Sequence, residues 1–404
     1  MPATSKITAF ALLLTVAVPG LAFAQHDHAA MLAAMSTKWK WTVDATGTLN
    51  LNIQDRKFND ITQVESQNWL MVMGGKKLGP ARLSLHGMFS LEPFTLRDIG
   101  SAEVFQTGET FDRRPLIDYQ HPHDLFMGLG ATLSGNARLR QGSGGQADAI
   151  IWSITAAVVG EPTLGPTAFM HRASSGGNPT APLSHHTADS THITHGVVAA
   201  GLTRGTMTVE GSVFHGREPD ENRLDIEMGK LDSFAGRVWY RRGPWAAQVS
   251  GGHLKQPDAT ELTDLNRYTA SVEYSGKTTP LKFTALFGMN DHPNLGGRDV
   301  KEYAWLTDAT WRVRPRDLAY LRAELVDKDI LEAGGYDPPE FAHAHPLSRV
   351  GALTLGYQRR LADFTHGNLG LGGDVSVYRT PANLLTPYGH PLSFHIFLIA
   401  KGSR

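Results

Sequence analysis

The chain has 404 residues, a formal net charge of −1 and no cysteine. A near-neutral charge argues against a nucleic-acid partner, which would need a basic surface. The absence of cysteine excludes thiolate chemistry and a disulfide framework.

The first residues have the organisation of a secretory signal peptide. Lys6 precedes an apolar run over residues 7–18, and Ala22 and Ala24 stand where a signal peptidase reads small residues. We predict a signal peptide over residues 1–24, a short tail over residues 25–37 and one barrel domain over residues 38–404. After Gln25 no apolar run is long enough for a spanning helix, so we expect any membrane crossing to use strands.

Alternation of apolar and polar residues dominates the rest of the chain. In residues 303–313 one parity is apolar, and the other holds Asp308, Thr310 and Arg312; residues 268–274, 318–325 and 394–400 show the same split. Neighbouring side chains of a strand point to opposite faces, so one face is apolar and the other polar. Aromatic residues are expected on the apolar face near strand ends, as in a membrane girdle: Trp69, Tyr240, Trp245, Trp305 and Trp311.

The joins between these strands alternate between short and long. Tight turns lie around residues 205, 243, 276, 315 and 362, and long polar joins cover residues 94–122, 160–190, 217–230, 256–264, 291–300, 328–346 and 380–389. This rhythm predicts an all-β protein, a transmembrane antiparallel barrel of about 16 strands with short periplasmic turns and long extracellular loops. Residues 94–122 and 160–190 are the candidates to fold into the lumen. The rival interpretation is a soluble all-β sandwich.

The predicted strands begin near Trp39, Asn68, Ala81, Asp124, Ala149, His192, Gly205, Asp232, Pro244, Leu265, Pro280, Lys301, Asp317, Leu347, Phe364 and Pro391. Two of them fit poorly, because residues 347–357 have mixed parity and residues 150–159 are apolar on both faces. Each is either misplaced or faces loops inside the barrel.

Over nearly its whole mature length, the chain resembles a Gram-negative outer-membrane barrel of porin type. The resemblance implies an outer-membrane location, the lipid bilayer as a partner, and passage of small solutes. Such barrels usually end on an aromatic residue, whereas here Phe397 is followed by LIAKGSR. The sequence therefore does not decide which residues form the strand that closes the barrel.

Histidines gather on the loop side of this topology. His121 and His123, and likewise His343 and His345, are two residues apart, so in an extended chain both rings of a pair face the same way. Neutral imidazole nitrogen suits zinc, copper, nickel and iron, and adjacent carboxylates suit zinc and iron; we expect copper or zinc. The candidate metal ligands are His121, His123, Asp124, His171, His185, His186, His192, His195, His343 and His345. The alternative is that each histidine is a hydrogen-bonded loop residue.

Two weaker resemblances point to metals. The mature start, with His26, His28, Met31 and Met35, resembles the His/Met-rich leader of copper-resistance outer-membrane proteins. Residues 160–196 resemble an uncharacterised family of His-rich outer-membrane barrels associated with metal resistance. Both resemblances imply copper as a ligand.

The polar parity also supplies charges of both signs to the lumen. The predicted channel-lining residues are Arg82, Glu210, Arg237, Arg241, Glu273, Lys282, Asp308, Arg312, Arg322 and Glu324. Opposed charges either favour small polar solutes in an open channel or neutralise each other and hold inserted loops.

Three functions follow from these patterns. The first is a porin-like channel for small solutes or metal ions with a His-rich extracellular mouth. The second is a metal-binding or sequestering outer-membrane protein of a copper-resistance system. The third is a metal-dependent hydrolase using His121, His123, Asp124 and His185, but no nucleophile or general-base motif accompanies them, so we expect no enzyme activity.

Overall fold

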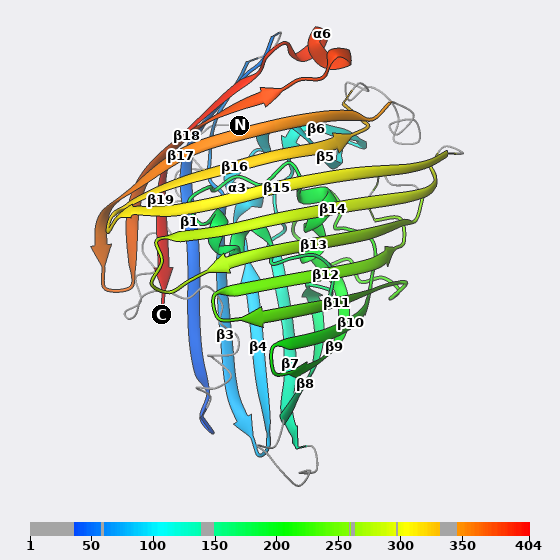
Figure 1. Cartoon of the computed structure of the whole chain (residues 1–404), viewed down its shortest axis with the longest axis vertical. Helices are drawn as coiled ribbons and strands as arrows, with labels where there is room; N and C mark the ends of the chain where they lie inside the picture. The colour runs from blue at the N-terminus through cyan, green and yellow to red at the C-terminus, as the bar shows by residue number, and fades with distance from the viewer. Residues whose placement is uncertain are drawn as a thin grey trace.

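Seventeen strands form one antiparallel sheet, and its first and last strands pair with each other. The computed structural model describes residues 36–57, 60–138, 149–257, 259, 263–295, 298–331 and 346–404. The predicted signal peptide and nearly all of the predicted tail lie outside these residues. Figure 1 shows the strands of the front wall crossing in front of β1 (Lys40–Asp55), β3 (Asn68–Leu78) and β4 (Ala81–Phe89) at the back.

Two consecutive strands share one position in the wall, which makes the closed barrel one of 16 strands. β2 (Ile61–Glu65) pairs with the second half of β1, and β3 pairs with its first half. The wall continues through β7 (Phe126–Arg138), β8 (Ala149–Gly160), β9 (Thr194–Arg204), β10 (Met207–Phe214), β11 (Ser233–Arg242), β12 (Trp245–Leu254) and β13 (Leu265–Ser275).

The remaining wall strands are β14 (Leu281–Leu295), β15 (Arg298–Arg314), β16 (Asp317–Lys328), β17 (Ser348–Phe364), β18 (Gly367–Arg379) and β19 (Leu392–Ser403). β19 closes the barrel against β1, from Asp44 opposite Ser403 to Asp55 opposite Leu392. The closing strand is therefore the one that contains Phe397, and its ring points inward.

Between β4 and β7 the chain leaves the wall. It forms the short helix α3 (Glu92–Thr95) and a separate hairpin of β5 (Ser101–Phe111) and β6 (Arg114–Gln120). Between β8 and β9 lie the 3-10 helices η1 (Phe169–His171), η2 (Ala173–Ser175) and η3 (Ser190–His192) and the helix α4 (His185–Ala188). η4 (Ala382–Leu384) and α6 (Leu385–Tyr388) connect β18 to β19.

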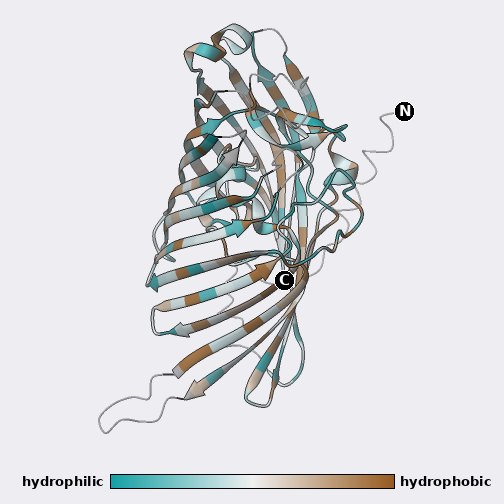
Figure 2. Cartoon of the chain, turned by 90° about the vertical axis from the view of Figure 1, so that its right-hand side faces the viewer, coloured by the Kyte–Doolittle hydropathy of each residue, from teal (hydrophilic) through white to brown (hydrophobic). Residues whose placement is uncertain are grey.

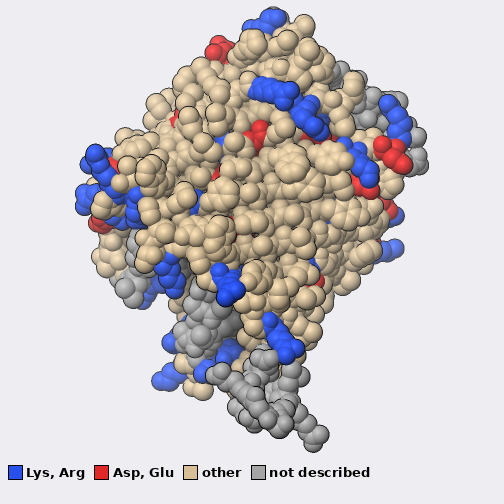
Figure 3. Space-filling view, in the orientation of Figure 1, with Lys and Arg blue, Asp and Glu red and all other residues tan. Residues whose placement is uncertain are grey.

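The predicted separation of faces is confirmed. Trp245, Trp305 and Trp311 are about half exposed on the outer surface, whereas Asp308 and Thr310 are buried inside. Figure 2 shows the resulting alternation of hydrophilic and hydrophobic bands along the strands. In Figure 3 Lys and Arg gather mainly near the two ends of the front strands, which leaves a broad band between them with few charges.

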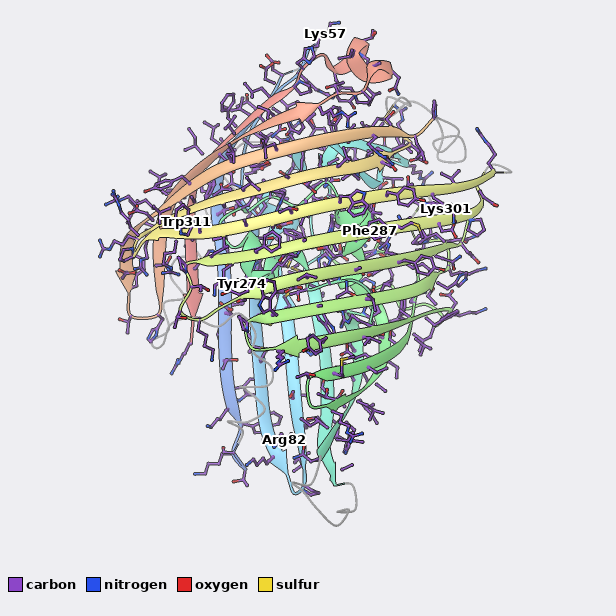
Figure 4. The ribbon with its side chains drawn as sticks, in the orientation of Figure 1. Lys57, Arg82, Tyr274, Phe287, Lys301 and Trp311 are labelled. Atoms are coloured by element: carbon purple, nitrogen blue, oxygen red, sulfur yellow. The ribbon has the colours of Figure 1, made fainter. Side chains whose placement is uncertain are left out.

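Outward aromatic rings form contacts at the turn end and near the middle of the strands. Trp245 lies 4.8 Å from Tyr274, and Phe287 lies 4.5 Å from Trp305, between ring centroids. In Figure 4 Tyr274 and Trp311 lie toward the turn end of their strands, and Phe287 lies near the middle of β14. Outward aromatic rings at the turn end are typical of a girdle of a transmembrane barrel. In the described part of the chain no helix is long and apolar enough to cross a membrane.

The structure bears out all 16 predicted wall strands, since each begins within three residues of its predicted start. Three details differ. Residues 291–295 and 298–300 are strand and not loop, because β14 ends at Leu295 and β15 begins at Arg298. Trp69 points inward, where its ring meets His171 at 5.1 Å. The strands β2, β5 and β6 were not predicted.

The two strands with irregular patterns face material inside the barrel. Val350 of β17 packs against Val104 and Phe105 of the hairpin. Val159 of β8 packs inside with Ile193. An inward apolar residue is stable at these positions because an inserted segment, not water, covers it.

Candidate functional site

The lumen is partly filled by two segments of the chain, the β5–β6 hairpin and residues 161–193. Figure 1 shows the short helices of these segments behind the front wall. Gln106 Nε2 of the hairpin donates to the Pro182 carbonyl at 3.0 Å, so the two segments contact each other. This confirms that the two predicted loops fold inward.

The hairpin is docked on inward-facing amides of the wall. Asn52 Nδ2 donates to the Ala102 carbonyl at 2.7 Å, and the Ala102 N–H donates to Gln63 Oε1 at 2.9 Å. The Val104 N–H donates to Gln54 Oε1 at 3.2 Å. The inward-facing amide side chains of β1 and β2 therefore form hydrogen bonds with backbone groups of the hairpin that would otherwise be buried without partners.

An apolar contact completes this docking. Phe105 is fully buried, and its ring lies 4.7 Å from Tyr388 and 5.6 Å from Tyr378. Its backbone has a positive φ of 69°, and the Phe105 N–H donates to Asp118 Oδ1 at 2.7 Å. The strained backbone is held by packing and by this carboxylate.

Residues 161–193 run along the inner face of the opposite wall. Near their start, the Gly165 N–H donates to Ser250 Oγ at 2.9 Å, and Arg237 Nη1 donates to the Gly165 carbonyl at 3.0 Å. Gly165 has a φ of +86°, and a Cβ there would lie 2.6 Å from the Ala188 carbonyl oxygen, so this turn requires glycine. Further on, Ser174 Oγ donates to Thr284 Oγ1 at 2.7 Å.

Arg172 joins this segment to the charged face of the barrel. It is almost fully buried and forms ion pairs with Asp189 and with Asp308, the latter at 3.4 Å. Arg322 Nε donates to the other oxygen of Asp308 at 3.0 Å. Two of the predicted channel-lining charges, Asp308 and Arg322, are thus neutralised at the inserted segment.

Glu324 has the same role at the next turn of the segment. It accepts hydrogen bonds from the Leu183 and Ser184 N–H groups at 3.2 and 3.0 Å. Glu210 pairs with Arg237 at 3.0 Å. These predicted charges also hold the segment or each other.

The other predicted lumen charges are spread around the wall. Arg241 lies over the Trp239 ring at 4.0 Å, and Glu273 faces Thr167. Arg82, Lys282 and Arg312 lie near turn ends of their strands, and Figure 4 shows Arg82 at the lower end of β4.

Five of the predicted histidines meet where the two segments touch, in what we call the five-histidine ring: His121, His123, His192, His185 and His186. Taken in that order, neighbouring ring centroids are 6.5, 5.7, 5.1 and 5.2 Å apart, and His186 returns to His121 at 5.5 Å. The Phe169 ring packs against three of them at 5.4–6.4 Å.

Carboxylates and carbonyls bind the Nδ1 atoms of these rings. His123 Nδ1 donates to Glu92 Oε2 at 2.8 Å, and His185 Nδ1 donates to Asp189 Oδ1 at 2.7 Å. His192 Nδ1 donates to the backbone carbonyl of Asp189 at 2.9 Å. These acceptors select the tautomer that leaves Nε2 with a free lone pair.

Several Nε2 atoms are buried without a hydrogen-bond partner: those of His123, His186 and His192. Burial is the largest cause that lowers the pKa of His121, His186 and His192 well below the ordinary value. Burial also lowers the pKa of His185, although Asp189 opposes the shift. The four imidazoles are therefore neutral at neutral pH, the form that binds metals.

The other predicted ligands lie outside this ring. His171 stacks edge-on against Trp69. His195 accepts the Glu227 N–H at Nδ1 and lies 3.7 Å from Asp124, which itself pairs with Arg223. His343 and His345 lie outside the described residues. The ring is buried between the inserted segments, whereas the sequence placed these histidines at an extracellular mouth.

Sequence reasoning missed the residues that orient the ring. These residues are Glu92, Glu109 and Arg172, and no motif in the sequence around them indicates a contact with the histidines. His121 Nε2 lies 3.0 Å from Glu109, and burial raises the pKa of Glu109 well above the ordinary value. The same carboxyl group also forms an ion pair with Arg223.

Two cavities adjoin the ring. The first, of about 790 Å³ including space open to solvent, lies between residues 169–181 and the wall of β1, β3 and β19; its lining includes Glu92, Glu103, His121, His123 and Lys401. The second, of about 490 Å³ on the same measure, has a lining that includes His186, Glu218, Glu302, Asp327 and Asp329.

A different acidic group meets the stricter geometry of a preformed cation site. Among the described residues, three ligand atoms come within 4.8 Å of one another only in the exposed loop group Asp220, Asp225 and Glu227. The five histidines of the ring instead lie close to one another in pairs, with neighbouring ring centroids 5.1–6.5 Å apart.

No protein-family model and no curated relative matches this chain. Among solved structures, it is similar to an anion-selective porin from Comamonas acidovorans, with 14% identity, 90% of this chain and 100% of that chain covered, and a TM-score of 0.56. It is also similar to OprB from Pseudomonas putida, with 9% identity, 94% of this chain and 96% of that chain covered, and a TM-score of 0.55. OmpF from Salmonella typhi has 9% identity, with 89% of this chain and 97% of that chain covered, and a TM-score of 0.52.

At these identities the likeness concerns the fold. Together with the closed wall and the apolar outer face, it confirms a porin-type barrel of the Gram-negative outer membrane. The two metal-related resemblances remain predictions.

Proposed function

We propose that this protein is a porin-like channel for small polar solutes and ions, narrowed by its two inserted segments. The observation that supports it is the first cavity, which separates residues 169–181 from the inner wall. Along β1 and β19 this cavity extends from Lys401, paired with Thr46 near the turn end, to Thr48 and beyond it to His123. Solutes would pass on this side of the inserted segment. We expect no enzyme activity.

The charges in the cavity lining suggest how the channel selects ions. Lys401 lies at the turn end and donates to the Gly176 carbonyl, while Glu92 and Glu103 lie farther toward the loops. A cation and two acidic side chains along one narrow passage control which ions enter at a given pH, because fields in a low-dielectric channel are strong.

The substitution Lys401→Glu tests the proposal in planar lipid bilayers. We expect the parent protein to conduct KCl and the variant to shift its reversal potential in a salt gradient toward cation selectivity. Lys277→Glu in an exposed periplasmic turn is the matched control and should leave the selectivity unchanged. A parent protein that folds but passes no current would contradict the channel.

Metal binding is the second candidate, and the five-histidine ring favours it. Its imidazoles are buried and neutral, and their Nδ1 acceptors fix the tautomer, as is typical of histidines that bind a metal through Nε2.

A further inference from the structure

We propose that the five-histidine ring is a transit site for a borderline transition-metal cation such as Zn²⁺ or Cu²⁺, which passes between the two cavities. This inference deepens the channel proposal and rests on it. His121 and His123 line the first cavity, and His186 lines the second. The ring is therefore the contact between two spaces on either side of the inserted segments.

The ligand atoms are in the chemical state that such a cation needs. Nε2 of His123, His186 and His192 has no hydrogen-bond partner although it is buried. An unpartnered buried nitrogen costs free energy, which a bound ion would recover. Glu92 and Asp189 hold Nδ1 of their histidines, as acceptors do behind metal-bound imidazoles.

The spacing fits binding by pairs of rings. Two imidazoles that share an ion at about 2.0–2.1 Å in tetrahedral geometry place their centroids about 5 Å apart. The His185–His186 and His185–His192 separations are 5.2 and 5.1 Å. Because no three of these nitrogens converge, each ion would be held by few ligands and released readily. Conduction needs such weak, multiple sites.

The surroundings favour a cation, and the imidazoles of the ring favour borderline cations over hard ones. The second cavity is lined by Glu218, Glu302, Asp327 and Asp329, against Arg267 and Lys328. Phe169 covers one side of the ring and limits access of water. Imidazole ligands favour zinc, copper and nickel over calcium or magnesium, which prefer oxygen.

The test uses the full-length mature protein without a polyhistidine tag, reconstituted into liposomes that contain a zinc-sensitive dye. Entry of Zn²⁺ is compared for the parent, His186→Gln and His192→Gln, and binding is measured by equilibrium dialysis. We expect both variants to lower Zn²⁺ affinity and entry by about tenfold. Their KCl conductance and heat-dependent migration in SDS should match the parent, which shows that they fold.

Two matched controls separate the ring from histidine in general. His215→Gln and His253→Gln change histidines that lie outside the ring, and Zn²⁺ entry should stay at the parent level. Glu92→Gln keeps every imidazole but removes the carboxylate behind His123, so Zn²⁺ affinity in equilibrium dialysis should fall about tenfold, while heat-dependent migration in SDS stays that of the parent. Ca²⁺ in place of Zn²⁺ should show no difference between parent and ring variants.

The outcomes distinguish this inference from the channel proposal. A parent that conducts KCl but neither binds nor passes Zn²⁺, or ring variants that pass Zn²⁺ like the parent, overturns the transit site and leaves the channel intact. A parent that binds Zn²⁺ at the ring but passes neither KCl nor Zn²⁺ overturns both the channel and the transit role.

Discussion

Glu103 shows how a single residue inside the barrel acquires a titration near physiological pH. Burial, with a smaller contribution from the nearby Glu324 carboxylate, raises the pKa of Glu103 from 4.5 to about 8. Its side chain nevertheless lines the first cavity. A raised carboxyl pKa means that Glu103 is protonated at neutral pH and gains its negative charge only as the pH rises through that value.

We therefore expect the preference for cations to increase between about pH 7 and 9, because one negative charge is added to the passage. Reversal potentials in a KCl gradient at several pH values measure this change. Glu103→Gln should reduce the step, whereas Asp363→Asn at the exposed end of β17 should keep it in full. If the reversal potential of Glu103→Gln changes with pH as in the parent, another group is responsible for the titration.

At the scale of elements, the inserted hairpin is held by side chains and not by the pairing of the wall. β5 and β6 form their own two-stranded sheet, and Phe105 fills a space between Tyr378 and Tyr388. A two-stranded hairpin alone is marginally stable, so its position depends on this docking.

Phe105→Ala should loosen the hairpin while the wall stays closed. Removing a fully buried phenylalanine costs about 3–5 kcal/mol, which is enough to release the backbone of the exposed hairpin tip for trypsin cleavage after Arg113; the bond after Arg114 precedes Pro115 and is resistant. Cleavage there, followed by mass spectrometry on folded protein, is the measurement. Phe111→Ala at the exposed tip is the control and should resist trypsin like the parent. Equal resistance of both variants would mean that other contacts hold the hairpin.

For the whole molecule, closure of the wall determines which residues face each side of the membrane. Asp220 lies in the exposed loop between β10 and β11, and Lys277 lies in the tight turn between β13 and β14. Long loops are extracellular and short turns periplasmic in this class of barrel.

A membrane-impermeant maleimide applied to intact cells should therefore label Asp220→Cys and not Lys277→Cys. The chain has no native cysteine, so the parent gives no background. Both variants should react after the cells are lysed, which is the control for thiol access. Labelling of only Lys277→Cys on intact cells would invert the orientation.

The strands could be predicted because their signal is local. Each wall strand meets lipid on one side, so its residues alternate whatever the distant chain does, and a shift by one residue would turn apolar side chains inward. Residues 303–313 show this pattern in the sequence, and β15 has Trp305 and Trp311 outside and Asp308 inside. The sequence alone therefore determined the barrel and the positions of its wall strands, and it indicated which two loops could fold inward.

The tertiary structure decided what the lumen contains. His121 and His123 meet His185, His186 and His192 only because two separate segments fold into one enclosed space. Glu92 reaches His123 from 31 residues away. Such contacts depend on how irregular chain fills a closed volume, where long-range packing and satisfaction of buried polar groups outweigh local propensity. For the same reason Trp69, predicted to face lipid, points inward toward His171.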